Sequence, residues 1–187
     1  MSKTYLAYLF LVLAALFWSG NFIVGKFATL FEIPPLTLNV FRWISVWFIL
    51  LPFTYKEIYS NLTYIKKNKF KLSQFTLIQL MVTVGVLFLI PQFFYEKSIG
   101  LELNLSKGFY LILFYVVVFP ALAAYYFWQK GIEIIGPNRA TMFIQLMPLF
   151  SAIMAIIIFK EKFALYHFAG ATFIIIGIYF SNRKFND

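Results

Sequence analysis

The chain has 187 residues, of which 62% are hydrophobic and 12% are charged, and its net charge is +9. Soluble domains carry about 25% charged residues, so the composition excludes a soluble protein and predicts a single membrane domain over residues 1–187. Cysteine is absent and histidine occurs once, which excludes disulfides, thiolate nucleophiles and multi-histidine metal sites, so neither a metal site nor a cofactor is predicted.

Apolar runs long enough to cross a bilayer recur along the chain. About 20 apolar residues in a helix span a hydrocarbon core of roughly 30 Å. The alternation over about 10 residues that β-barrel strands require is absent. The sequence therefore predicts an all-α, polytopic transmembrane helical bundle of about six helices, at residues 5–30, 35–55, 72–95, 108–129, 139–159 and 163–182.

Prolines mark both the boundaries and the interiors of these helices. Proline is favoured at the first helical position because its missing N–H would be unpaired there, so the second helix is predicted to begin at Pro35 or Leu36. Pro91 and Pro120 are expected to kink the helices that contain them. Pro148 frees the carbonyl of Ile144, which membrane helices tolerate where neighbouring groups or water satisfy it.

The lysines and arginines predict the orientation. Of the 16, ten lie on the side of the N-terminus, five lie on the opposite side, and Arg42 lies within a helix. Basic segments stay cytoplasmic, so both termini are predicted to be cytoplasmic. Charges in short loops indicate membrane orientation rather than nucleic-acid binding, so the expected surroundings are the lipid bilayer. The predicted cytoplasmic loop at 56–71 carries Lys56, Lys66, Lys67, Lys69 and Lys71.

Arg42 is the sharpest single feature. A charge within a membrane helix costs at least about 2.5–3.5 kcal/mol on insertion scales, so it is a functional-site candidate that would bind an anionic or carbonyl group. It also lies about 9 Å from the predicted outer end of its helix, where the side chain could instead snorkel to the interface. The two interpretations stay open, whereas Lys26, closer to the surface, is expected to snorkel.

Other polar and aromatic side chains complete a candidate solute site. Asn21 is expected to form interhelical hydrogen bonds or to contact solute. Trp18 and Tyr125 are deep enough to line a cavity, whereas Trp128, next to Lys130, is interpreted as an interface anchor. The predicted substrate-binding residues are Trp18, Asn21, Arg42, Tyr125 and Gln145.

No enzyme motif occurs in the sequence. It contains no H-E-x-x-H motif, no G-x-S-x-G elbow and no paired intramembrane carboxylates, so a non-enzymatic protein is predicted. Every acidic residue is expected in a loop, a turn or the C-terminal tail. Glu161, for example, is expected to complement the dipole of the last helix.

Several stretches follow one another in a recognisable order: Trp18–Lys26 (WSGNFIVGK), Ala123–Trp128 (AAYYFW), Ala140 through Pro148 to Lys160-Glu161-Lys162, and Gly170–Gly177. In order and spacing they resemble the EamA-type transporters of the drug/metabolite transporter superfamily. The resemblance is strongest from Tyr110 to Asn182.

The resemblance implies a multi-pass protein of the bacterial inner membrane that exports small organic solutes or metabolites by alternating access. Its family pattern is ten helices in two inverted repeats, so helices three to six would be missing between Ser60 and Lys71. Losing an even number of helices preserves the predicted orientation. Two alternatives stay open: a truncated or vestigial protein without transport activity, and a protein that acts only as a homodimer.

Overall fold

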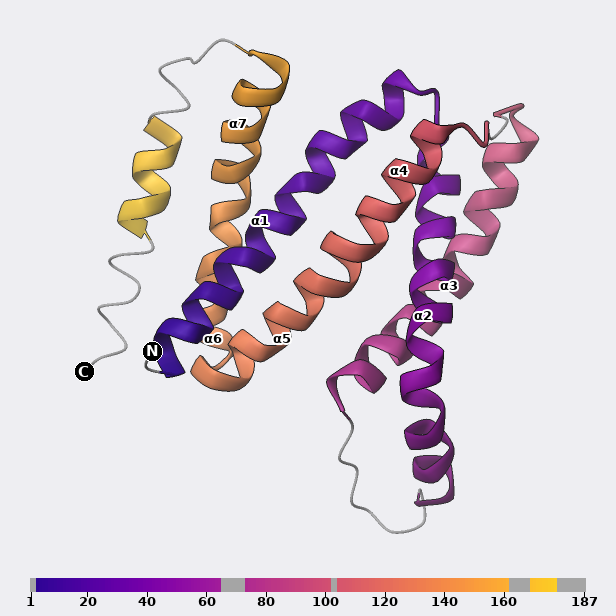
Figure 1. Cartoon of the computed structure of the whole chain (residues 1–187), viewed down its shortest axis with the longest axis horizontal. Coiled ribbons are helices and arrows are strands. Elements are labelled where there is room, and N and C mark those ends of the chain that lie inside the picture. Colours follow the sequence, from indigo (N-terminus) through magenta and orange to yellow (C-terminus); the bar gives the residue numbers. More distant parts are fainter. Residues whose placement is uncertain (1–2, 65–72, 102–103, 162–168, 178–187) are drawn as a thin grey trace. The chain divides into compact units, whose positions relative to one another are not determined.

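A computed structural model describes residues 3–64, 73–101, 104–161 and 169–177. The described residues form helices and connections without any strand, which confirms the all-α prediction (Figure 1). Residues 169–177 are also helical. The elements are α1 (Lys3–Leu30), α2 (Pro35–Tyr64), α3 (Gln74–Ser98), α4 (Lys107–Val116), a π-helix (Val117–Ala123), α5 (Ala124–Ile135), α6 (Pro137–Ala140), a 3-10 helix (Thr141–Gln145) and α7 (Leu146–Phe159).

Five helical stretches of the described chain are long and apolar enough to cross a membrane. They correspond to the first five predicted helices, and the helix at 169–177 falls inside the sixth, whose other residues lie outside the described ranges. The five stretches are Lys3–Leu30, Pro35–Ser60, Phe75–Ser98, Lys107–Ile135 and Pro137–Phe159.

The helix boundaries differ from the predicted ones mainly at their polar ends. The second helix begins at Pro35 as predicted but continues to Tyr64, so residues 56–64 of the predicted loop are helical. This segment contains neither glycine nor proline, and a charged residue such as Lys56 is a good helix former once the chain leaves the apolar core. The fourth predicted helix runs on to Ile135, where Gly136, with φ of +82°, ends α5.

The expectation that every acidic residue lies in a loop, a turn or the tail was wrong. Glu57 lies in α2, Glu96 in α3 and Glu133 in α5. Each stands close to the end of a helix, and the apolar run alone placed that end too early. Glu96 is the most consequential of the three because its side chain is buried, with a relative exposure of 2%.

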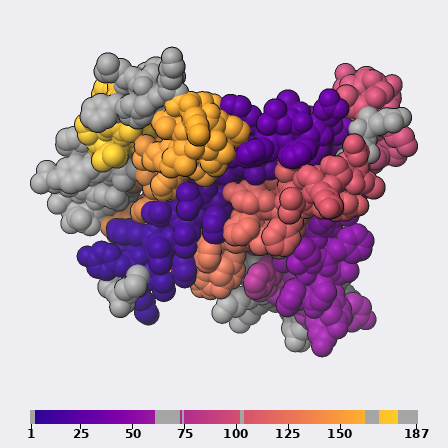
Figure 2. Space-filling view, turned by 45° about the horizontal axis from the view of Figure 1, so that its top comes forward, coloured from indigo at the N-terminus to yellow at the C-terminus, as the bar shows by residue number. Residues whose placement is uncertain are grey.

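The chain divides into two compact units. Unit 1 comprises residues 1–26 and 123–187, and unit 2 comprises residues 27–122. The core of unit 1 forms around Leu11, Ala140 and Phe143, with the Tyr8 ring tilted against that of Phe143 at a centroid distance of 5.3 Å. The helix α7 belongs to the surface shown in orange in Figure 2, and none of its own residues is buried.

Unit 2 is built on the antiparallel pair α2 and α3. Its core lies along the seam between them and against α4, where Phe109 packs edge-on against Phe41 at 5.7 Å. Large apolar side chains also point outward, as Phe88 does with a relative exposure of 73%, and such a surface suits contact with lipid. The buried seam residues include Val46, Leu50, Ile78, Val82 and Ile112.

The close packing of unit 1 depends on Gly131. A Cβ atom added there would lie 2.5 Å from Cδ2 of Leu11, which is itself completely buried. We expect Gly131→Ala to destabilise the protein by about 1–3 kcal/mol because the core has no room to shift. Gly85→Ala is the matched control: nothing lies within 4 Å of the added atom, so the better helix former should stabilise α3 by about 0.5–1 kcal/mol. Unfolding in mixed micelles measures both effects, and equal destabilisation by the two variants would contradict this packing.

Candidate functional site

Three aromatic side chains of unit 1 meet in what we call the aromatic cluster: Trp18, Tyr125 and Trp128. The ring of Trp18 lies 5.4 Å from that of Tyr125, edge to face, and 5.3 Å from that of Trp128. Tyr125 and Trp128 are three residues apart on α5 and therefore share one helix face, on which Trp18 of α1 packs. All three are partly buried, so part of each side chain remains exposed.

The backbone departs from the α-helix just before Tyr125 in the sequence and again before Pro148. Pro120 cannot donate a backbone hydrogen bond, and the helix widens around it into the π-helix Val117–Ala123, just before Tyr125. Before Pro148 the chain tightens into the 3-10 helix Thr141–Gln145. In membrane proteins such departures from the α-helix are tolerated where the backbone is packed in protein or lines a water-filled cavity.

Ser19 links α1 to α7 beside this irregular segment. Its hydroxyl is completely buried and lies 3.0 Å from the carbonyl oxygen of Met147, the residue before Pro148. It also lies 2.6 Å from the carbonyl of Ala15, one turn earlier on α1. One hydroxyl proton is thus shared between a carbonyl of its own helix and one of the neighbouring helix, which fixes the two helices in register.

The structure brings together only part of the predicted substrate-binding set. Trp18 and Tyr125 are in contact, and Asn21 follows Trp18 by three residues on α1 and is partly buried. Gln145 is exposed at the end of the 3-10 helix. Arg42 belongs to unit 2, where its guanidinium lies 4.8 Å from the ring centre of Trp43.

Two residues of unit 1 have contacts that were not predicted from the sequence. Trp128, predicted to be an interface anchor, is also a member of the aromatic cluster, and its spacing of three from Tyr125 was the signal for this. Lys26, expected to snorkel, forms an ion pair of 2.9 Å with Glu161 and lies 4.1 Å from the ring centre of Phe159. Both charged groups are about half exposed, so this pair adds little stability.

Glu96, near the end of α3, binds the start of α2. Its two carboxylate oxygens accept the backbone N–H groups of Leu36, at 2.9 Å, and Thr37, at 2.6 Å. These are donors of the first turn of a helix, which have no partner inside it. Pro34 precedes the helix and has no side-chain acceptor to cap them. The carboxylate of α3 therefore replaces the missing cap of α2 and faces the positive end of its dipole.

Glu57 of α2 makes the equivalent contact at the start of α3. Its carboxylate, on α2, accepts hydrogen bonds from the backbone N–H and the hydroxyl of Ser73 and from the hydroxyl of Thr76. The Ser73 hydroxyl in turn caps α3 by accepting from the N–H of Thr76 at 3.3 Å. Each helix of the pair thus contributes one glutamate to the N-terminus of the other.

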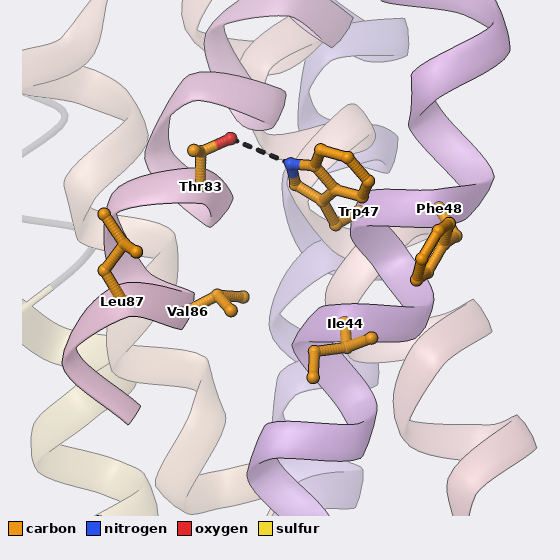
Figure 3. A pocket seen from close by; sticks show the side chains of 6 residues that line it. All are labelled: Ile44, Trp47, Phe48, Thr83, Val86 and Leu87. Carbon is orange, nitrogen blue, oxygen red and sulfur yellow. Dashed lines mark hydrogen bonds between the residues drawn. The ribbon is translucent and has the colours of Figure 1, made fainter. Parts of the chain in front are cut away.

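A groove runs along α2 and α3, between the contact of Glu96 at one end of the pair and that of Glu57 at the other. One part, lined by Ile44, Trp47, Phe48, Thr83, Val86 and Leu87, has a volume of about 330 Å³ (Figure 3). The other has a volume of about 680 Å³ and also includes Trp47 and Thr83. In Figure 3, the indole Nε1 of Trp47 donates a 3.0 Å hydrogen bond to the hydroxyl of Thr83 across the groove. The second part is further lined by Leu51, Tyr55, Lys56, Ile58, Tyr59, Gln79 and Leu80.

Among the described residues, no group of three or more His, Cys, Asp or Glu side chains could hold a metal ion. The candidate sites of the described chain are therefore the aromatic cluster with its irregular backbone, the Arg42 side chain, and the α2–α3 groove.

Comparison with known proteins gives one family and one relative. The EamA-like transporter family matches residues 60–183. The chain is also 27% identical over 96 residues to a Bacillus subtilis (strain 168) protein described as "Uncharacterized transporter YetK", and the aligned part covers 51% of this chain and 29% of that protein. No solved structure matches the chain. The family match contains the stretch from Tyr110 to Asn182, whereas the motif at Trp18–Lys26 precedes it.

Proposed function

The chain belongs to the EamA-like transporter family, and on that premise we propose that it carries a small organic solute across the cell membrane, in the outward direction, by alternating access. Family membership and the five apolar helices make it a multi-pass membrane protein. The observation that carries the proposal is the family match over residues 60–183. The relative from Bacillus subtilis is itself described as a transporter, and the chain spans 29% of its length.

The aromatic cluster is the part of unit 1 best suited to hold a solute. The faces and edges of Trp18, Tyr125 and Trp128 favour an apolar or aromatic body, and indole faces also attract organic cations. The 3-10 helix before Pro148 supports this placement because interrupted helices form the substrate sites of many transporters. We propose that solute enters the site through rearrangement of this segment.

A flux measurement with a matched pair of variants tests the site. The full chain is reconstituted into vesicles loaded with three radiolabelled solutes that differ in chemistry: phenylalanine, leucine and choline. We expect Trp18→Leu to lower the flux of the transported solute at least tenfold, because losing one aromatic anchor of a binding site costs about 2 kcal/mol or more.

Phe22→Leu is the control for this test. Phe22 lies one turn further along α1 and has a relative exposure of 63%, so its loss should leave flux within about twofold of the wild type. Equal flux in the wild type and Trp18→Leu would remove the aromatic cluster from the proposed site. Equal loss in both variants would show that α1 tolerates no change, and it would contradict a specific role for Trp18.

A further inference from the structure

Both halves of the α2–α3 groove are lined mainly by apolar surface, and we call the half that also carries Lys56 and Gln79 the polar half and the other the apolar half. In the apolar half Ile44, Val86 and Leu87 present only hydrocarbon, and the polar atoms of Trp47 and Thr83 bind each other (Figure 3). The rim is open, since Phe48 and Leu87 are 62% and 63% exposed. A hydrocarbon chain lying between the two helices would cover this surface, and no polar group of the groove would lose a hydrogen bond.

The polar half lies toward the end of α2 and carries a cation, two phenols and an amide. Lys56 is exposed, with its ammonium 5.8 Å from the ring centre of Tyr55. Gln79 has a relative exposure of only 1%, and its Nε2 donates to the carbonyl of Trp47 at 3.3 Å. Within the described ranges its buried Oε1 has no hydrogen-bond partner. An occupant of this half therefore needs an anionic group for Lys56 and a donor for the amide of Gln79.

The basic segment that follows α2 in the sequence favours a membrane lipid over a soluble solute as the occupant of the groove. Lys66, Lys67, Lys69 and Lys71 follow α2 in the sequence, in the loop that the charge distribution predicts to be cytoplasmic. Basic segments next to a membrane helix attract anionic lipids, by about fivefold per lysine near the surface. Lys56 adds a cation inside the groove itself.

We propose that the α2–α3 groove is a binding site for an anionic phospholipid whose headgroup carries a hydroxyl. The phosphate lies at Lys56, the headgroup hydroxyl donates to Oε1 of Gln79, and one acyl chain passes Trp47 and occupies the apolar half between Ile44 and Val86. The site does not depend on the proposed transport function, because its occupant is a component of the bilayer.

Tryptophan quenching by brominated lipids tests this site on the full chain. Vesicles of phosphatidylcholine receive a minor fraction of phosphatidylglycerol, and either lipid carries bromine on its acyl chains. We expect brominated phosphatidylglycerol to bind at the quenching site at least fivefold more tightly than brominated phosphatidylcholine. Trp47→Phe should remove most of this lipid-dependent quenching, because Trp47 lines both halves of the groove.

Two lysine variants separate the groove from general surface charge. Lys56→Gln should lower the preference for phosphatidylglycerol by about fivefold, whereas Lys97→Gln should keep it. Lys97 is also an exposed lysine of the same helix pair, but it lies at the opposite end, in the last turn of α3. An equal preference in all three proteins, or equal loss in both variants, would overturn the proposal.

A second lipid comparison tests the role of Gln79 without depending on a variant. Phosphatidylmethanol carries the same phosphate as phosphatidylglycerol but no headgroup hydroxyl, so the wild type should bind it several-fold more weakly. Gln79→Leu should bind the two lipids equally, with helix content checked by circular dichroism. Equal binding of both lipids by the wild type would contradict the hydroxyl contact. Equal quenching by phosphatidylglycerol and phosphatidylcholine would exclude the lipid site altogether.

Discussion

Glu96→Ala is expected to lower the free energy of unfolding by about 3 kcal/mol, since two hydrogen bonds to a charged group are lost and buried donors are left unpaired. The N–H groups of Leu36 and Thr37 would then have no acceptor, because Pro34 offers no side-chain cap. Glu96→Gln should fall between the wild type and Glu96→Ala, because the amide retains one acceptor oxygen but not the charge that faces the helix dipole.

The measurement is unfolding in mixed micelles followed by circular dichroism, with Glu133→Ala as control. Glu133 is also a glutamate within a helix, but its side chain is 59% exposed and its ion pair is with Lys130, three residues earlier. Its loss should change stability by no more than about 0.5 kcal/mol. If Glu96→Ala were as stable as Glu133→Ala, the carboxylate would not be the cap of α2.

Arg42→Ala is expected to lower solute flux at least tenfold. Removing one partner of a buried charge contact typically costs about 2–5 kcal/mol, and we propose that Arg42 binds an anionic or carbonyl group of the solute. Arg42 lies about two turns after α2 begins and is partly buried, with its guanidinium over Trp43. Arg42→Lys should retain part of the activity, because it keeps the charge but loses the planar fork.

The competing interpretation, in which Arg42 only snorkels to the interface, makes the opposite prediction. Flux would then be unchanged in Arg42→Ala and in Arg42→Lys. Lys107→Ala serves as the control, because Lys107 is an exposed cation at the start of α4 and its loss should leave flux near the wild-type value. Initial rates in reconstituted vesicles, normalised to the protein incorporated, distinguish the two interpretations.

The membrane spans could be predicted from the sequence because two requirements act on each stretch separately. The stretch must be apolar over the thickness of the bilayer core, and its backbone N–H and C=O groups must be hydrogen-bonded within the helix. The start of α2 was predicted correctly at Pro35 for the same local reason. The polar ends of helices were predicted poorly: residues 56–64 read as a basic loop yet are helical. A charged residue near the membrane interface can lie either in a helix or in a loop. Its hydrogen-bond and ion-pair partners decide which of the two it adopts.

Those partners are far away in the sequence. Glu96 binds the N–H groups of residues about 60 positions earlier, and Lys26 pairs with a glutamate 135 positions later. Residues so far apart in the sequence show no periodic pattern from which their contact could have been predicted. The unusual helix start at Pro34-Pro35, without a Ser, Thr, Asp or Asn cap, was the one local sign that an acceptor had to come from elsewhere.

The candidate site was predictable in part. The sequence indicated Trp18 and Tyr125 as cavity residues by their depth, and the structure places them in contact. Trp128 was predicted to be an interface anchor because Lys130 follows it closely. Its contact with Trp18 was not predicted, although its spacing of three from Tyr125 puts both on one helix face. The α2–α3 groove could not be predicted, because helices that are apolar all round give no period that shows which side chains face each other.

Solute flux through vesicles that contain the purified full chain tests the central claim most directly. Vesicles loaded with phenylalanine, leucine and choline are diluted into solute-free buffer, and efflux is compared with that of protein-free vesicles of the same lipid composition. Transport by this chain predicts saturable efflux of at least one solute, well above the protein-free rate and reduced at least tenfold in Trp18→Leu. Efflux of all three solutes at the protein-free rate would contradict it.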